Sequence, residues 1–379
     1  MFNMLRQWYG RHFSDPQVVI LALLLLTVFS IVVLLNELLA PVFAAVVIAY
    51  ILEGLISRMH KRWHMPRWVA VLLVMLTFLV ALVFLFLSIL PVLVQQLGQF
   101  FRELPTMLLI GQERILLLPE RYPNLFSVQE INAFMSDIRV QLANLGQRIV
   151  SVSLASLVDI FTFIVYLVTV PILVFFILID KQRVLQWFRQ FLPDSNGLTL
   201  KVWHEVDRKI GSYVRGKFIE ILIVGAAAFV VFRFLGLNYA LLLSVVVGLS
   251  VIIPYVGAIA VTIPVVLVAY FQWGLTGDFW TVVSAYVIIQ LLDGNVLVPL
   301  LFSEVVNLHP IAIVVAILFF GGIWGVWGIF FSIPLATLID TVIKAWPRFV
   351  SADAETNIVV ESTINQSVST DTIKTATNA

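Results

Sequence analysis

Long apolar runs separated by short polar segments dominate the chain. Two of them, residues 18–35 and 69–94, contain no charged side chain. A helix needs roughly 20 consecutive apolar residues to cross about 30 Å of hydrocarbon. This pattern predicts helices at residues 18–36, 39–56, 68–94, 153–179, 217–236, 239–271, 279–302 and 309–343. The sequence therefore predicts an all-α, polytopic membrane protein with about eight hydrophobic segments.

The composition supports this fold class. Hydrophobic residues make up 61% of the 379 positions and charged residues only 12%, whereas soluble domains are about half apolar and a quarter charged. The chain has no cysteine, which excludes disulfides and thiolate metal sites.

The charges between the apolar runs predict an orientation. Residues 180–217 hold eight basic and four acidic side chains, and residues 57–67 are also basic. Residues 95–152 hold five of each sign. Because cytoplasmic loops are enriched in Lys and Arg, we expect both termini and the two basic segments to be cytoplasmic.

These patterns divide the chain into regions. We expect membrane helices 1 to 3 in 1–94, an extracytoplasmic amphipathic helical segment in 95–152, membrane helix 4 in 153–179, a cytoplasmic amphipathic segment in 180–216, a C-terminal transmembrane transport region in 217–350 and a disordered cytoplasmic tail in 351–379. The tail has ten Ser or Thr residues and no aromatic residue, so it cannot bury a core.

Two apolar segments carry residues that interrupt a helix. "VIIPYVGAIAVTIP" lies within 239–271, and "GGIWGVWG" within 309–343. Broken helices at membrane depth are tolerated where they are buried in protein or line a wet cavity, and in transporters they form the binding site. The candidate residues at the breaks are Pro254, Tyr255, Gly257, Trp324, Gly325, Trp327 and Gly328. Re-entrant hairpins, single kinked spans and a kink that only packs tightly at glycine all fit this pattern.

A carboxylate lies within the segment between the two breaks. Asp293 is flanked by Gln290 and Asn295. A charged side chain at that depth is costly unless it is protonated, paired or hydrated, so it is a functional candidate. The alternative is that Asp293 lies near an interface and closes a helix end with Gly294.

Two other acidic residues invite a simpler interpretation. Glu220 follows Arg215 and Lys217, and we expect it to reach the cytoplasmic membrane surface. Glu53 is expected at a helix end, also at an interface.

Enzyme motifs are incomplete. "GSYVRGKF", residues 211–218, has the spacing of a phosphate-binding loop, but Phe218 stands where Ser or Thr would hold Mg²⁺. We expect no enzymatic activity, catalytic residue, cofactor, metal site or nucleic-acid partner. The expected partners are membrane lipid and a small molecule or cation.

Several stretches resemble one family. "YVRGK", "PILVFFILIDK", "IIPYVGAIAV" and "DGNVLVPLLFSEVVNLHPIAIVVAILFFGGIWGVWGIFFSIPLATLID" are similar to the AI-2E family of permeases, and most closely to its PerM-type members. The resemblance implies a bacterial inner-membrane protein, oligomeric, associated with autoinducer-2 export or with Na⁺(Li⁺)/H⁺ antiport. Two positions depart from the family pattern: Ala258, where a second proline is common, and Lys217, where glutamine is frequent.

Three functions remain open from the sequence. The first is a secondary transporter that exports a small polar solute, such as autoinducer-2, with ion coupling through Asp293. The second is a Na⁺(Li⁺)/H⁺ antiporter in which Asp293 and Asn295 bind the ion. The third is a membrane scaffold without transport activity, which predicts that Asp293→Asn has no effect.

Overall fold

The structure is a computed structural model that describes residues 33–115, 157–190, 197–302 and 308–345, with a few isolated positions between them. The described residues form helices and connecting turns and contain no strand. Most of residues 116–152 in the expected amphipathic segment 95–152, the tail at 351–379 and most of the first segment, 18–36, lie outside them.

Six described helical segments are long and apolar enough to cross a membrane. This finding confirms an all-α polytopic membrane protein, although the number differs from the expected eight. One expected segment lies outside the described residues. Another, 217–236, is part of a longer mixed helix, and 239–271 is divided into a short and a long helix.

The N-terminal part consists of α3 (Asn36–Trp63), α4 (Arg67–Phe84), the π-helix η1 (Leu85–Ile89), α5 (Leu90–Ile115), α8 (Leu157–Ile179) and α9 (Lys181–Arg189). Helix α4 runs through η1 into α5, so the expected end at residue 94 is not a helix end. The apolar side chains of α3, α4 and α8 pack into one cluster around Ala45, Ile56, Val71 and Val174.

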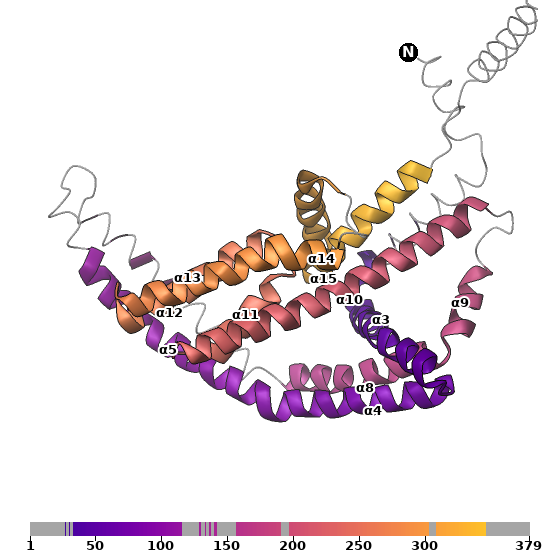
Figure 1. The fold of residues 1–379 in the computed structure, drawn as a ribbon, viewed down its shortest axis with the longest axis horizontal. Coiled ribbons are helices and arrows are strands. Elements are labelled where there is room, and N and C mark those ends of the chain that lie inside the picture. The colour runs from indigo at the N-terminus through magenta and orange to yellow at the C-terminus, as the bar shows by residue number, and fades with distance from the viewer. Residues whose placement is uncertain are drawn as a thin grey trace, which may run out of the picture.

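The C-terminal part consists of α10 (Gly197–Phe234), α11 (Ala240–Ser250), α12 (Val256–Trp273), α13 (Gly277–Leu292), the π-helix η2 (Asp293–Leu297), α14 (Val298–Phe302) and α15 (Pro310–Ala345). Helix α10 has 38 residues and is therefore about 57 Å long. It joins the expected cytoplasmic segment to the expected span in one helix. It contacts α3, α11, α13, α14 and α15 and crosses the middle of the molecule (Figure 1).

The first broken segment is a helical hairpin. The backbone N–H of Asn238, before α11, donates to Gln272 Oε1 near the end of α12 at 2.8 Å, and Gln272 Nε2 donates to Gly236 O at 2.8 Å. The two ends of the segment are therefore side by side, and α11 and α12 pack along each other through Val247, Val261 and neighbouring residues.

The second broken segment also folds back. Its backbone is non-helical at Gly325, with φ 59° and ψ −131°. A Cβ at Gly328 would overlap the carbonyl oxygen of Phe320, yet residues eight apart on a straight helix are about 12 Å apart along its axis. Ile313 and Ile333, from the two arms, join the same apolar cluster. The two arms of α15 diverge from this bend in Figure 1.

The two hairpins open at opposite ends of α10. The first opens beside the C-terminal end of α10. The second follows α14, where the Phe302 ring lies 5.7 Å from that of Tyr213 in the N-terminal half of α10. The returning arm of α15 is held at the same end, because Lys209 Nζ donates to Thr341 Oγ1 at 3.3 Å. The hairpins therefore approach the centre from opposite directions.

Candidate functional site

The tip of the first hairpin is a tight turn between Ser250 and Val256. The backbone N–H of Val256 donates to Pro254 O at 2.7 Å, which closes a three-residue turn around Tyr255. Tyr255 has φ 63° and ψ −54°, a γ-turn geometry that is rare and strained. Gly257 is required because a Cβ there would overlap the Ser250 carbonyl oxygen. Proline and glycine thus break the helix where α11 must reverse.

A cavity of about 280 Å³ lies against this tip. Its wall combines the tip with α10, the α13–η2–α14 helix and both arms of α15. Apolar and aromatic side chains form most of the wall. The lining residues are Tyr213, Lys217, Glu220, Val251, Ile253, Pro254, Tyr255, Ala258, Gln290, Asp293, Gly294, Val298, Phe302, Ile313 and Ile333. Apolar walls with a few polar groups are typical of small-molecule sites.

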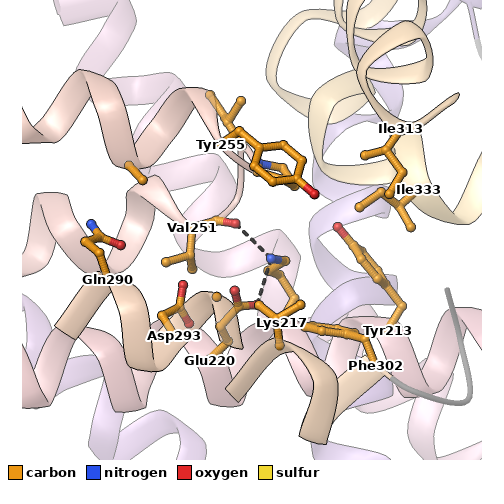
Figure 2. Close-up of a pocket in the computed structure, with 15 residues that line it drawn as sticks. Tyr213, Lys217, Glu220, Val251, Tyr255, Gln290, Asp293, Phe302, Ile313 and Ile333 are labelled. Atoms are coloured by element: carbon orange, nitrogen blue, oxygen red, sulfur yellow. Dashed lines mark hydrogen bonds and ion pairs between the residues drawn. The ribbon is translucent and has the colours of Figure 1, made fainter. Parts of the chain in front are cut away.

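A buried ion pair forms the charged part of the wall. Lys217 and Glu220, one turn apart on α10, are 3% and 2% exposed, and Lys217 Nζ lies 2.7 Å from Glu220 Oε2. The same ammonium donates to Val251 O at 2.8 Å and lies 5.2 Å from the centre of the Phe302 ring. Figure 2 shows Lys217 between Glu220 and the hairpin tip.

Two further polar groups of the cavity have no partner within the described protein. They are the buried carboxylate oxygen Oδ1 of Asp293 and the hydroxyl of Tyr213. Buried polar groups are nearly always hydrogen-bonded, and an unpaired one costs about 1–3 kcal/mol. Asp293 opens the π-turn η2 and lies beside Glu220 in Figure 2. The cavity therefore presents an acceptor and a hydroxyl that a bound solute or water can satisfy.

The expected site residues fall into two groups. Four of them, Pro254, Tyr255, Gln290 and Asp293, line the cavity. Gln290 Nε2 donates to the hydroxyl of Tyr286 at 2.7 Å. Asp293 does not close a helix end, since the helical backbone continues through η2 to Phe302.

Other expected residues lie away from the cavity wall. Gly257 is buried behind the hairpin tip. Asn295 is exposed and its Nδ2 donates to Leu291 O at 2.9 Å. Neither of them lines the cavity, so the structure does not bring Asn295 together with Asp293 there.

The residues of the second break form an aromatic cluster instead. Phe43 of α3 has its ring centre 6.1 Å from those of both Trp324 and Trp327. Gly325 provides the positive φ and Gly328 the close approach to Phe320. These four expected site residues thus shape and pack the second hairpin, and they do not line the cavity around Asp293.

The interpretation of Glu220 as a surface-directed side chain is wrong. Glu220 and Lys217 are among the most buried polar residues of the described chain, because α10 turns this face toward the hairpin tip and α14. The sequence offered one signal for this ion pair: Lys217 and Glu220 have i,i+3 spacing and precede an apolar stretch. That spacing does not show which face of α10 is buried.

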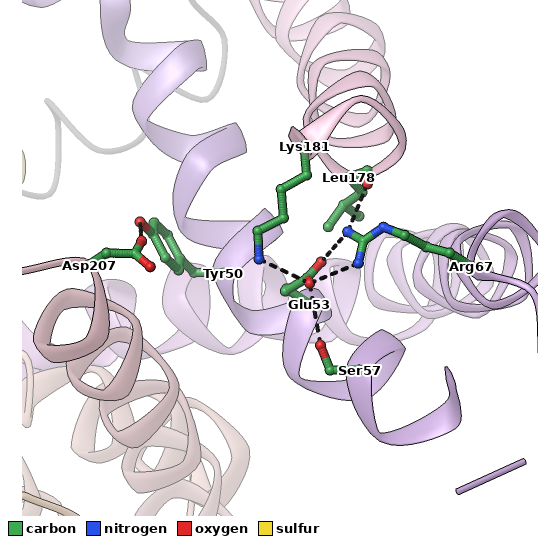
Figure 3. A network of polar contacts seen from close by, with 7 residues as sticks. All are labelled: Tyr50, Glu53, Ser57, Arg67, Leu178, Lys181 and Asp207. Atoms are coloured by element: carbon green, nitrogen blue, oxygen red, sulfur yellow. Dashed lines mark hydrogen bonds and ion pairs between the residues drawn. The ribbon is translucent and has the colours of Figure 1, made fainter. Parts of the chain in front are cut away.

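A second polar cluster joins the helices of the N-terminal part. Glu53 accepts from Arg67 at 2.9 Å and from Lys181 at 3.1 Å, and Arg67 also donates to Leu178 O. Glu53 lies well inside α3, so its expected position at a helix end is wrong. Nearby, the Tyr50 hydroxyl donates to Asp207 at 2.6 Å and ties α3 to α10 (Figure 3). This cluster holds α3, α4, α8 and α10 together.

An all-α membrane protein with two helical hairpins, and with an apolar-walled cavity that holds a few polar groups at the tip of one of them, has the architecture of a membrane transporter. The family model for the AI-2E family transporter matches residues 19–348. The chain therefore belongs to the AI-2E family, which confirms the resemblance seen in the sequence motifs. It is a multi-pass membrane protein of a permease family.

Individual relatives are consistent with this assignment. The chain is 46% identical over 347 residues to "Putative permease PerM" of Escherichia coli, covering 92% of this chain and 98% of that protein. It is 28% identical to "Putative transport protein YueF" of Bacillus subtilis, with coverage of 81% and 84%. It is 23% identical to "AI-2 transport protein TqsA" of Escherichia coli, with coverage of 81% and 86%.

Proposed function

We propose that the protein is a secondary transporter that exports a small polar organic solute, such as autoinducer-2, with ion coupling at Asp293. The observation that carries this proposal is the pair of unpartnered groups in one apolar-walled cavity, Asp293 Oδ1 and the Tyr213 hydroxyl. An organic solute with hydroxyl groups would satisfy both. A small inorganic cation would make no use of the aromatic and aliphatic wall, which an organic solute would contact.

The charges support ion coupling. The cavity wall contains two carboxylates, Glu220 and Asp293, and one ammonium, Lys217. When all three are ionised, one negative charge remains uncompensated in an apolar setting, which is costly. A proton or a cation on Asp293 removes that charge. Binding and release of that proton or cation at Asp293 can therefore be linked to movement of the hairpin.

A Na⁺(Li⁺)/H⁺ antiporter is the second candidate. The favouring observation is again the unpartnered Asp293 oxygen, together with the free main-chain groups expected at a broken helix. In this function Asp293 would hold the cation directly. The proposal of Asn295 as a second ligand has less support, since its amide is engaged with Leu291.

Inside-out membrane vesicles with an imposed pH gradient test these functions. A quenched fluorescent dye reports the gradient, and sodium, lithium and autoinducer-2 are added separately. Dequenching by autoinducer-2 that is lost in Asp293→Asn supports the exporter, and dequenching by sodium or lithium supports the antiporter. Asp278→Asn, an exposed carboxylate in the first turn of α13, is the matched control. Equal behaviour of wild type and Asp293→Asn would favour a scaffold without transport.

The topology is part of the proposal. We place both termini and residues 180–216 in the cytoplasm, residues 95–152 outside it and the transport region in residues 217–350, and we expect homo-oligomers in the membrane. The chain lacks cysteine, so single cysteines introduced near each segment can be labelled uniquely from one side. If a cysteine in residues 95–152 were labelled only from the cytoplasm, the proposed orientation would be wrong.

A further inference from the structure

We infer that Lys217 is a tethered cation: its ammonium holds the position in the cavity that a free monovalent cation would otherwise occupy. The protein is then independent of sodium at this position. The inference rests on the proposed function only for its consequence in transport. The occupancy itself follows from the contacts of Lys217.

The ammonium has the surroundings of a bound cation. It lies between a carboxylate oxygen of Glu220 at 2.7 Å and the main-chain oxygen of Val251 at 2.8 Å. The face of the Phe302 ring, 5.2 Å away, completes the shell. Carbonyl oxygens at the broken ends of half-helices are the groups that coordinate cations in transporters, and aromatic faces attract cations.

The hairpin tip adds to the negative potential. Val251 is the C-cap residue directly after α11, and the C-terminal end of a helix carries a partial negative charge. That end, Glu220 and Asp293 converge on one wall of the cavity (Figure 2). Lys217 is the only cation among the described residues that line it. A cation at this point is therefore required to balance the negative charge of this wall.

The tether keeps that cation in place. The side chain starts from α10, is 3% exposed, and lies beside Gly216, where a Cβ would come within 2.8 Å of the Phe302 ring. The ammonium therefore cannot exchange with solution as a free ion does. Glu220 is neutralised permanently by its neighbour, and Asp293 is left as the carboxylate that gains and loses an ion.

Purified protein tests the inference through its melting temperature. Asp293→Asn, alone and combined with Lys217→Ala or Lys217→Gln, is melted at equal ionic strength in sodium, lithium, methylammonium or N-methylglucamine chloride. The Asp293→Asn substitution removes the other carboxylate that can bind a cation, so the protein that keeps Lys217 should melt at the same temperature in all four salts. The variants that lack Lys217 should melt about 2–4 °C higher with the small cations than with N-methylglucamine. Adding Glu220→Gln to Asp293→Asn/Lys217→Ala should abolish that difference.

Lys209→Ala, also combined with Asp293→Asn, is the matched control, since Lys209 forms an ion pair with Glu205 on the same helix outside the cavity and its loss should confer no cation dependence. A sodium-dependent melting temperature of Asp293→Asn with Lys217 in place would overturn the inference. Folded variants that are indifferent to cations, or variants that stay unfolded in every salt, would also overturn it. The readout needs no transported solute, so a failed transport assay beside cation-dependent variants would refute only the proposed function.

Discussion

The two helical hairpins reverse the chain in the same way but face different surroundings. In each, a glycine lies directly against a carbonyl oxygen from the preceding arm: Gly257 against Ser250 and Gly328 against Phe320. A proline follows in each returning arm, at Pro264 and Pro334. The first tip faces Lys217, Glu220 and Asp293 across a cavity, whereas the second packs among aromatic rings with Phe43.

This difference separates the requirements of the turn from those of the site. Glycine and proline satisfy the geometry of a reversal at membrane depth, and they are present in both hairpins. The chemistry comes from the helices opposite the tip, α10 and the π-turn η2. A break in a membrane helix is thus a place where a site can form, and the facing side chains decide whether one does.

The largest expected effect is on the charged wall of the first hairpin. Lys217→Met leaves Glu220 buried without its partner, which should lower the free energy of unfolding by about 3–5 kcal/mol. Thermal or chemical unfolding in detergent measures the loss. The double variant Lys217→Met/Glu220→Met should recover most of it, because no unpaired charge remains. A double variant as unstable as the single one would contradict the role of the pair.

A smaller effect tests the shared turn. Gly257→Ala and Gly328→Ala each force a methyl group against a backbone carbonyl, and each should cost about 1–3 kcal/mol of stability. Only Gly257→Ala should also reduce transport in variants that still fold, because it displaces the cavity wall. Gly322→Ala is the control, since its Cβ would meet nothing within 4 Å. Equal transport by both variants would remove the functional distinction between the hairpins.

Tyr255 and Gly325, one at each hairpin tip, both have positive φ, and substitutions at them should change stability in opposite directions. Tyr255→Gly relieves a strained backbone and should raise stability by about 1 kcal/mol, while reducing transport because the Tyr255 ring leaves the cavity wall. Gly325→Ala, at φ 59°, should instead lower stability by about 1 kcal/mol or more. Unfolding curves and vesicle transport compare the two. A destabilised Tyr255→Gly would show that its ring contributes more than its backbone strain costs.

The smallest effect concerns one hydroxyl group. Tyr213→Phe removes a buried donor that has no partner in the described protein, so stability should remain within about 0.5 kcal/mol of wild type. If the hydroxyl binds the transported solute, KM should rise about tenfold. Trp327→Phe, at the second tip, should leave KM unchanged. A Tyr213→Phe variant with normal KM would exclude the hydroxyl from binding.

Much of the fold could be predicted from the sequence because the bilayer restricts which secondary structures can cross it. Apolar runs of about 20 residues predict helices, and Pro254, Gly257 and Gly325 predict the breaks. The hairpin geometry could not be predicted, since it depends on contacts such as that between Asn238 and Gln272.

The site could be predicted only in part. Asp293 stood out as a carboxylate within an apolar segment, and Pro254 and Tyr255 stood out at a break. Lys217 stood out only as a departure from the family pattern, and neither it nor Glu220 was predicted as a site residue, because their burial depends on the rotation of α10 and on Val251, 34 residues after Lys217. Periodicity shows which residues share a face of a helix, but it does not show what that face meets.

The turn at Tyr255 also sets an order of assembly during synthesis. The strained backbone and the polar groups of this turn cannot remain exposed to lipid. One of the elements that covers them, η2, ends at Leu297, 42 residues after Tyr255. At about 5–20 residues per second the ribosome needs a few seconds to make that stretch. During this interval water, α10 or the insertion machinery must cover the nascent hairpin, because the remaining helices that line the cavity, α13, η2, α14 and α15, are made after it.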